Sequence, residues 1–230
     1  MSSSEIGDNL ARHGLILRGG FAFAPGDAAP AIVGRGPARA VLLIGQRGAE
    51  PWPHFEAWLA NQSQAIANPL DTWSRQIIEG LAFECGTHAV FPSDKPYLPF
   101  QQWAMRAEGL LPSPLGILMH PEYGLWHAYR GALLFDDTAP VDACHDLSPP
   151  PAASNHLCAL CAGKPCLNAC PVGAHRVEGF DYPGCLAYVR SATGGACRSD
   201  GCFDRNACPY GTAFRYPADV QAFHMAAFAQ

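Results

Sequence analysis

Basic residues are scarce in this chain: 15 Lys and Arg stand against 20 Asp and Glu over 230 residues, and the net charge is −5. The sequence contains no block rich in Lys and Arg that would follow a phosphate backbone or an anionic membrane surface. Its apolar runs are also shorter than the roughly 20 residues that a membrane-spanning helix requires. We therefore expect neither nucleic acid nor membrane among its partners.

A secretion signal is also missing from the N-terminus. Acidic residues stand where a signal peptide needs basic ones, and no apolar segment follows them. Eight of the ten cysteines lie between Cys158 and Cys208, whereas Cys85 and Cys144 are the two before them. Without a signal, this segregation favours metal-bound thiolates in a reducing compartment over disulfides. We expect a cytoplasmic protein.

Strand and helix patterns alternate along the first 135 residues, which predicts an α/β fold. The run "AVLLIG", ending at Gly45, is typical of a strand buried on both faces. Residues 71–85 repeat apolar side chains at helical spacing, with Asp71 as the expected N-cap and Cys85 on the side that faces the core. Residues 116–135 predict two strands that pair around a turn at residues 121–124.

The composition changes between residues 136 and 156, where three consecutive prolines stand among few apolar residues. Such a stretch is typical of a linker. Cys144 lies inside it and has no apparent chemical partner there. We therefore expect two domains, an α/β domain over residues 1–150 and a cysteine-rich module over residues 151–230.

Two cysteine-rich runs in this module each end in a Cys-Pro pair. Residues 158–171 have the spacing C-x2-C-x4-C-x3-C-P, and residues 197–209 have the spacing C-x4-C-x5-C-P. With Cys185 between them, the runs supply eight thiolates. That is the number that two [4Fe–4S] clusters take, at one thiolate per iron.

The ligands are expected to cross between the two runs, because in two-cluster ferredoxins the Cys before proline binds the other cluster. This rule predicts a set 1 and a set 2 of ligands. Set 1 is Cys158, Cys161, Cys166 and Cys208, and set 2 is Cys170, Cys185, Cys197 and Cys202. Zinc in four-cysteine sites is the structural alternative. Paired C-x2-C units with a longer span between them are typical of zinc, so the tight run ending in Cys-Pro favours iron–sulfur.

The stretch "CLNACPVGAHRVEGFDYPGCLAYVR", residues 166–190, resembles the dicluster ferredoxin module of the epoxyqueuosine reductases, cobalamin-dependent enzymes related to the reductive dehalogenases. The runs "NPLDTWSRQI" and "HPEYGLWHAYRG" are similar to cobalamin-processing proteins of the CblC type, whose fold is related to flavin nitroreductases. The resemblance implies a nitroreductase-like or CblC-like sheet with flanking helices, then a ferredoxin-like two-cluster module. It also implies cobalamin as a further cofactor, with FMN as the alternative.

The resemblance also suggests residues for the cofactor chemistry. Asp94 lies near the position of the reductases' acidic proton donor and is the candidate catalytic residue, with a solvated turn residue as the alternative. The candidates for contacting a corrinoid or flavin lie at or beside the expected turn; they are His120, Tyr123, Trp126 and His127. A turn that is merely packed by aromatic side chains is the alternative for these four.

Two functions fit this sequence. In the first, the clusters deliver electrons to a corrinoid or flavin on the N-terminal domain, as in a reductase. In the second, the chain is a ferredoxin-like electron carrier whose N-terminal domain docks a redox partner protein. A cysteine-nucleophile hydrolase has little support, because neither Cys85 nor Cys144 is followed by a His/Asn arrangement. Whether the chain is itself an enzyme is left open.

Overall fold

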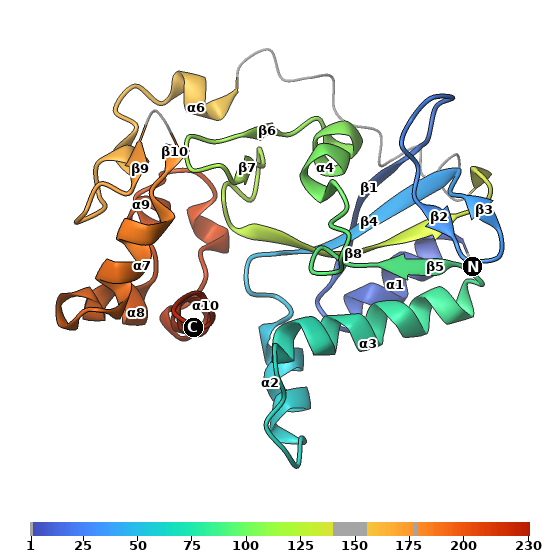
Figure 1. Ribbon diagram of the computed structural model, residues 1–230, viewed down its shortest axis with the longest axis horizontal. Coiled ribbons are helices and arrows are strands. Elements are labelled where there is room, and N and C mark those ends of the chain that lie inside the picture. Colours follow the sequence, from blue (N-terminus) through green and yellow to red (C-terminus); the bar gives the residue numbers. More distant parts are fainter. Residues whose placement is uncertain (1, 140–155, 177–178) are drawn as a thin grey trace. The chain divides into compact units, whose positions relative to one another are not determined.

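The computed structural model describes residues 2–139, 156–176 and 179–230 (Figure 1). Its contacts divide the chain into two units. Unit 1 is Met1–Leu110 with Ala128–Ala153, and unit 2 is Leu111–His127 with Ser154–Gln230. The domain boundary expected near residue 150, like Cys144, lies outside the described residues. Residues 111–127, which the sequence assigned to the first domain, group by their contacts with the cysteine-rich unit.

Unit 1 is built on a four-stranded sheet in the order β1-β4-β8-β5. The strands are β1 (Ile16–Ala22), β4 (Ala40–Arg47), β8 (His127–Phe135) and β5 (His88–Val90). β1 pairs antiparallel with β4, and β5 pairs antiparallel with β8. β4 is buried over nearly all of its length, so the strand predicted from "AVLLIG" is confirmed. β2 (Ala31–Ile32) and β3 (Gly36–Pro37) precede β4 along the chain and pair with each other in a short antiparallel ribbon.

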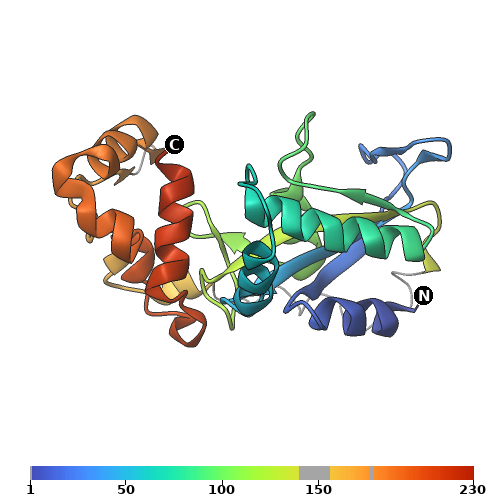
Figure 2. The same cartoon turned by 90° about the horizontal axis from the view of Figure 1, so that it is seen from below.

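Helices cover both faces of this sheet, as the buried strand predicts. α1 (Ser3–Ala11) and α3 (Pro69–Glu84) lie on one face, and α4 (Phe100–Glu108) lies on the other (Figures 1 and 2). α2 (Trp52–Ala60) precedes α3 along the chain. The mixed helix-and-sheet fold expected from the sequence is therefore confirmed for this unit.

Two glycines let helices approach the sheet closely. A Cβ at Gly131 on β8 would lie 2.8 Å from the Ile78 Cδ1 atom of α3. A Cβ at Gly19 on β1 would lie 3.1 Å from the backbone oxygen of Ala107 on α4, and Gly19 also has a φ of +77°. Because both positions are crowded, the two helix layers sit directly on the strands.

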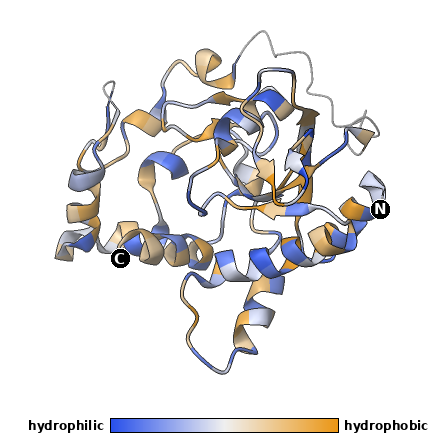
Figure 3. Ribbon diagram, turned by 45° about the vertical axis from the view of Figure 1, so that its right-hand side comes forward, coloured by the Kyte–Doolittle hydropathy of each residue, from blue (hydrophilic) through white to orange (hydrophobic). Residues whose placement is uncertain are grey.

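The start of α3 differs from the sequence prediction. The helix begins at Pro69 with Asn68 as its N-cap, whereas Asp71 lies in the first turn. Proline suits this position because its fixed φ is helical and its missing N–H would be unpaired there anyway. Hydrophilic and hydrophobic residues alternate along α3 (Figure 3). Cys85 is the C-cap and is half-buried, which keeps it a structural thiol at the end of the helix.

A buried ion pair joins β1 to α4. Arg18, which is 3% exposed, donates two hydrogen bonds of 2.8 Å to the two carboxylate oxygens of Glu108. The same guanidinium donates to the backbone oxygen of Gln46 and to the Tyr129 hydroxyl. A bidentate pair with further hydrogen bonds satisfies a buried charge well.

We predict that Arg18→Met lowers the free energy of unfolding by about 3–5 kcal/mol, because Glu108 is left as an uncompensated buried charge. Urea unfolding followed by circular dichroism measures this loss. The matched control is Arg18→Met with Glu108→Leu, which removes both charges and recovers most of the stability. A loss below about 1 kcal/mol, the value of an exposed pair, would contradict the prediction.

The expected pairing of two strands over residues 116–135 is wrong. β7 (Leu118–Met119) pairs with β6 (Leu111–Pro112), and β8 instead enters the main sheet between β4 and β5. The turn itself is present, with mutual backbone hydrogen bonds between His120 and Gly124. β8 is fully buried from Gly131 to Phe135, and the main sheet offers it a partner on each side, which a two-stranded hairpin does not.

Unit 2 consists of short helices and turns around the cysteines. Its helical elements are α6 (Leu157–Leu160), η2 (Pro165–Leu167), α7 (Tyr182–Arg190), η3 (Ala192–Gly194), α8 (Gly195–Asp200), α9 (Phe203–Asn206), η4 (Thr212–Phe214) and α10 (Ala218–Phe228). A small ribbon pairs β9 (His175–Arg176) with β10 (Gly179–Phe180). Across the described ranges of the whole chain, no helix has the length and apolar character needed to cross a membrane.

Candidate functional site

The four thiols of set 1 line one pocket in unit 2. Cys158 comes from α6, Cys161 follows that helix, Cys166 lies in η2, and Cys208 follows α9. The pocket is narrow, and a water-sized sphere can occupy only about 10 Å³ of it. Its other lining residues are Ser113, Pro114, Met119, Leu125, Lys164, Pro209 and Tyr210. Residues 50 positions apart in the sequence thus meet at one place.

Burial and mutual repulsion act on the thiols of set 1. The pKa of Cys158 is raised to about 11, mainly by burial and then by the neighbouring thiols Cys208, Cys166 and Cys161, whereas Lys164 acts to lower it. Burial also raises the pKa of Cys166 and of Cys208. A bound cation would reverse this effect, because metal coordination deprotonates a thiol outright.

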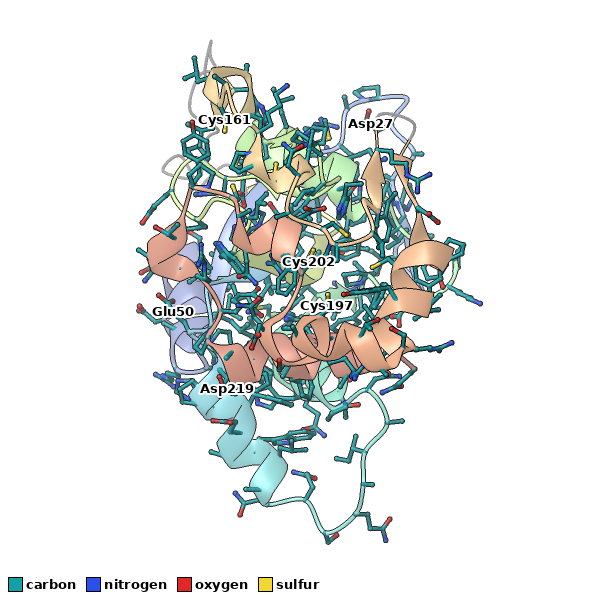
Figure 4. All side chains as sticks on the ribbon, turned by 90° about the vertical axis from the view of Figure 1, so that its left-hand side faces the viewer. Asp27, Glu50, Cys161, Cys197, Cys202 and Asp219 are labelled. Atoms are coloured by element: carbon teal, nitrogen blue, oxygen red, sulfur yellow. The ribbon has the colours of Figure 1, made fainter. Side chains whose placement is uncertain are left out.

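The thiols of set 2 are also close enough to one another for their charges to raise the pKa of a neighbouring thiol. The pKa of Cys185 is raised to about 11, mainly by burial and then by the neighbouring thiols Cys202, Cys170 and Cys197. Cys185 lies in the first turn of α7, where Asp181 caps the helix by accepting the N–H of Gly184 at 3.0 Å. Cys197 and Cys202 lie close to one another, and Cys161 of set 1 lies well apart from them (Figure 4).

The described residues hold nine cysteines, and all nine are free thiols. Within the same residues, no group of three or more His, Cys, Asp or Glu side chains is placed to hold a metal ion. A single zinc ion needs its sulfur ligands about 2.3 Å from one point. A [4Fe–4S] cluster instead binds each thiolate at a different iron. The assignment of both sets as ligands stays a prediction.

His120 and Tyr123 form a stacked pair of rings at the turn in unit 2. Their rings stack with centroids 3.8 Å apart and an interplanar angle of 3°. The Nδ1 atom of His120 accepts the backbone N–H groups of Glu122 and Tyr123 at 3.1 and 3.0 Å. Both side chains are half-buried, so each has surface that a bound group can meet.

Trp126 and His127, the other two candidates for cofactor contact, are buried. Trp126 is 0% exposed and packs edge-on against Tyr216, with the Arg205 guanidinium 4.4 Å from its ring centre. The Nε2 atom of His127 makes a hydrogen bond of 2.8 Å to the backbone oxygen of Leu118. These two side chains hold the turn in place, so we place His120 and Tyr123 ahead of them as contacts.

The turn touches the loop that follows Cys208. A Cβ at Gly124 would lie 2.3 Å from the backbone oxygen of Tyr210, and a Cβ at Gly211 would lie equally close to the backbone of Tyr123. Both glycines have positive φ, so a side chain at either one meets strain as well as a clash. Leu125 and Met119 also pack with Cys208 in one apolar cluster. The turn and set 1 therefore share a core.

Asp94 lies on the surface of unit 1, in the turn after β5. Its carboxylate, 47% exposed, forms an ion pair with the Arg75 guanidinium, and this bond is the main cause that raises the pKa of Arg75. Arg75 also lies over the ring of Phe91. The role of Asp94 as a proton donor stays a prediction.

A second pocket, in unit 1, was missed by the sequence analysis. Its empty space is about 490 Å³, including the opening to solvent, and it is lined by Asp71, Ser74, Phe91, Pro92, Ser93, Tyr129 and Arg130. Arg130 donates to the Gln46 side chain at 2.7 Å and lies 4.0 Å from the Asp71 carboxylate. Two quoted runs, "NPLDTWSRQI" and "HPEYGLWHAYRG", both contribute lining residues. Their joint occurrence was the available signal for this pocket.

No family model matches the chain, and no curated protein matches it. Among solved structures, the C. elegans B12-trafficking protein CblC, a human MMACHC homologue, is 14% identical with a TM-score of 0.56, over 98% of this chain and 90% of that one. Epoxyqueuosine reductase from Bacillus subtilis is 13% identical with a TM-score of 0.48, over 94% and 69%. An epoxyqueuosine reductase bound to a tRNA-Tyr stem loop is 13% identical with a TM-score of 0.47, over 94% and 68%.

At this level of identity, the likeness to CblC establishes a related fold and nothing about activity. The CblC-like fold expected from the sequence is thereby confirmed. The two reductases, with TM-scores below 0.5, add no argument. The ferredoxin-like character of the C-terminal part belongs to the proposal that follows.

Proposed function

We propose that this chain is an iron–sulfur redox protein with two [4Fe–4S] clusters, one on set 1 and one on set 2. It delivers electrons to a corrinoid, or alternatively a flavin, bound by the N-terminal domain expected over residues 1–150, which includes the turn of His120 and Tyr123. The observation that carries the proposal is the gathering of thiols into two groups of four: Cys158 with its three neighbours in set 1, and Cys185 with its three in set 2.

The chemistry of the donors fits the clusters. When bound, [4Fe–4S] clusters supply one-electron transfer at potentials that hydrogen bonds and solvent exposure tune. Cysteines from the run 158–166, together with Cys208, line the pocket of set 1, and Met119 and Leu125 cover them with apolar surface. Such a shell limits solvent access to the donor atoms. In this arrangement the thiolates would bind the irons of the cluster, and the apolar side chains exclude water.

The corrinoid part of the proposal is supported by the CblC-like fold and by the turn. His120 and Tyr123 present a stacked pair of rings whose turn shares its core with set 1. A flat ring pair is suited to packing against a planar cofactor. Trp126 and His127 act as supports for this pair, and Asp94 remains the proposed proton donor.

The alternative is a ferredoxin-like carrier that docks a redox partner protein without holding a corrinoid. Both functions use the same eight thiolates. The tRNA stem loop named above belongs to an epoxyqueuosine reductase. For this chain, with its net charge of −5, the absence of a nucleic acid partner stays a prediction.

Titration of the cluster-loaded chain with cob(II)alamin and with FMN separates the two functions, once the clusters have been reduced by a chemical reductant and the excess removed. We expect saturable binding of cob(II)alamin, and reduction of its cobalt by one electron for each cluster that is oxidised, followed by absorbance. His120→Ala should weaken this binding, whereas Glu122→Ala, an exposed change in the same turn, should not. Binding of FMN alone would favour the flavin. Binding of neither cob(II)alamin nor FMN would contradict the reductase function and favour the ferredoxin-like carrier.

A further inference from the structure

Asp204 is a fully buried carboxylate, 0% exposed, on α9. This helix stands between Cys202, which belongs to set 2, and Cys208, which belongs to set 1. A buried carboxylate is costly unless hydrogen-bond donors surround it. The residues that donate hydrogen bonds to Asp204 therefore identify the segment that its carboxylate fixes.

Among the described residues, the hydrogen bonds that the Asp204 carboxylate accepts come from one segment, residues 169–175. The Oδ1 atom accepts the backbone N–H of Ala169 at 3.1 Å and that of Cys170 at 2.7 Å. The Oδ2 atom lies 2.7 Å from Nδ1 of His175, whose side chain is 13% exposed. Charge-assisted bonds of this length are about twice as strong as neutral ones.

This segment is where the chain passes from set 1 to set 2. Cys166 lines the pocket of set 1, and Cys170, four residues later, is a neighbour of Cys185 and Cys197 in set 2. The peptide that makes this transition is the one whose N–H groups Asp204 accepts. The carboxylate is thus the anchor of the crossing that the Cys-Pro rule predicted.

The charge of Asp204 also reaches both sets. After burial and the neighbouring thiols Cys208 and Cys161, it raises the pKa of Cys166. Burial is the largest cause of the raised pKa of Cys202; the carboxylate of Asp204 also raises it, whereas the backbone N–H groups of Arg205 and Asp204 lower it. A fixed anion in a buried place acts more strongly on a charge than it would in water.

We propose that Asp204 is a positioning residue that holds Cys170 on the second cluster and whose buried charge lowers the reduction potential of both clusters. The inference rests on the proposed function, because it concerns the same eight thiolates. An added electron is disfavoured beside a fixed negative charge, and cluster potentials respond to net charge and hydrogen bonds.

Two variants separate the positioning from the charge. In Asp204→Asn the side-chain oxygen still accepts the N–H groups of Ala169 and Cys170, but the negative charge is gone. We expect about eight irons per chain to be retained, since two clusters hold eight. We expect both midpoint potentials to rise, with a tenfold change in the reduction equilibrium, about 59 mV for one electron.

Asp204→Ala removes the anchor together with the charge. We expect preferential loss of the second cluster, seen as a fall in iron toward about four per chain and loss of one of two cluster signals in electron paramagnetic resonance. The control is Asp219→Asn, an exposed carboxylate on α10 of the same unit, which should change neither iron content nor potential.

The inference is overturned if Asp204→Asn leaves both potentials at the values of the unchanged chain, or if Asp204→Ala keeps both clusters. Should the alanine variant fail to fold by circular dichroism, the potentials of the asparagine variant decide. An unchanged chain that takes up no iron is a different result, since it removes the proposed function and the inference together.

Discussion

Replacing Cys185 with Ala is expected to lower the iron content of the anaerobically reconstituted chain from about eight to about four per chain, because a [4Fe–4S] cluster takes one thiolate per iron. Cys185 stands alone between the two runs and is half-buried among Cys202, Cys170 and Cys197. No other described cysteine lies on α7 to replace it. The signal of the first cluster should stay.

The matched control for this change is Cys85→Ala. Cys85 is also a half-buried thiol whose pKa burial raises, but it caps α3 in unit 1 and belongs to neither set. It should leave iron and sulfide unchanged. If the Cys185 variant keeps both cluster signals, or if the Cys85 variant loses one, the ligand assignment is wrong.

A pair of double variants tests whether the ligands cross between the runs. Cys185→Ala with Cys208→Ala should abolish both clusters, since Cys208 lines the pocket of Cys158, Cys161 and Cys166. Iron should then fall from about eight to about zero per chain. Cys185→Ala with Cys197→Ala removes two ligands of one set, so about four irons should remain.

An uncrossed arrangement gives the opposite result. There, Cys185 and Cys208 would serve the same cluster, and both double variants would keep about four irons. Iron and sulfide assays on the two proteins, prepared side by side, therefore decide the arrangement. Circular dichroism of both, compared with the unchanged chain, shows that the difference reflects ligands rather than unfolding.

Local patterns in the sequence were enough to predict much of unit 1. The buried strand β4 is a run of apolar residues, and α3 repeats apolar residues at helical spacing. Both features depend on neighbours along the chain. The spacing of the cysteines likewise predicted two sets of four by the Cys-Pro rule, and their role as cluster ligands stays a prediction.

Long-range contacts were not predictable in the same way. The apolar residues of β8 do not say which strand they pair with, so the expected hairpin gave way to the main sheet. The grouping of residues 111–127 with the cysteine-rich unit depends on Gly124 and Gly211, whose contact joins positions far apart in sequence. The sequence did not reveal the role of Asp204 either, because a buried carboxylate is recognised only by hydrogen-bond partners that are distant in sequence.

The central claim is that eight thiolates hold two iron–sulfur clusters, and elemental analysis of the chain purified under strict exclusion of air tests it most directly. The account predicts about eight irons and about eight acid-labile sulfides per chain, with no stoichiometric zinc. Zinc bound at one or two ions per chain without sulfide would contradict it, since zinc in four-cysteine sites is a structural staple that carries no electrons.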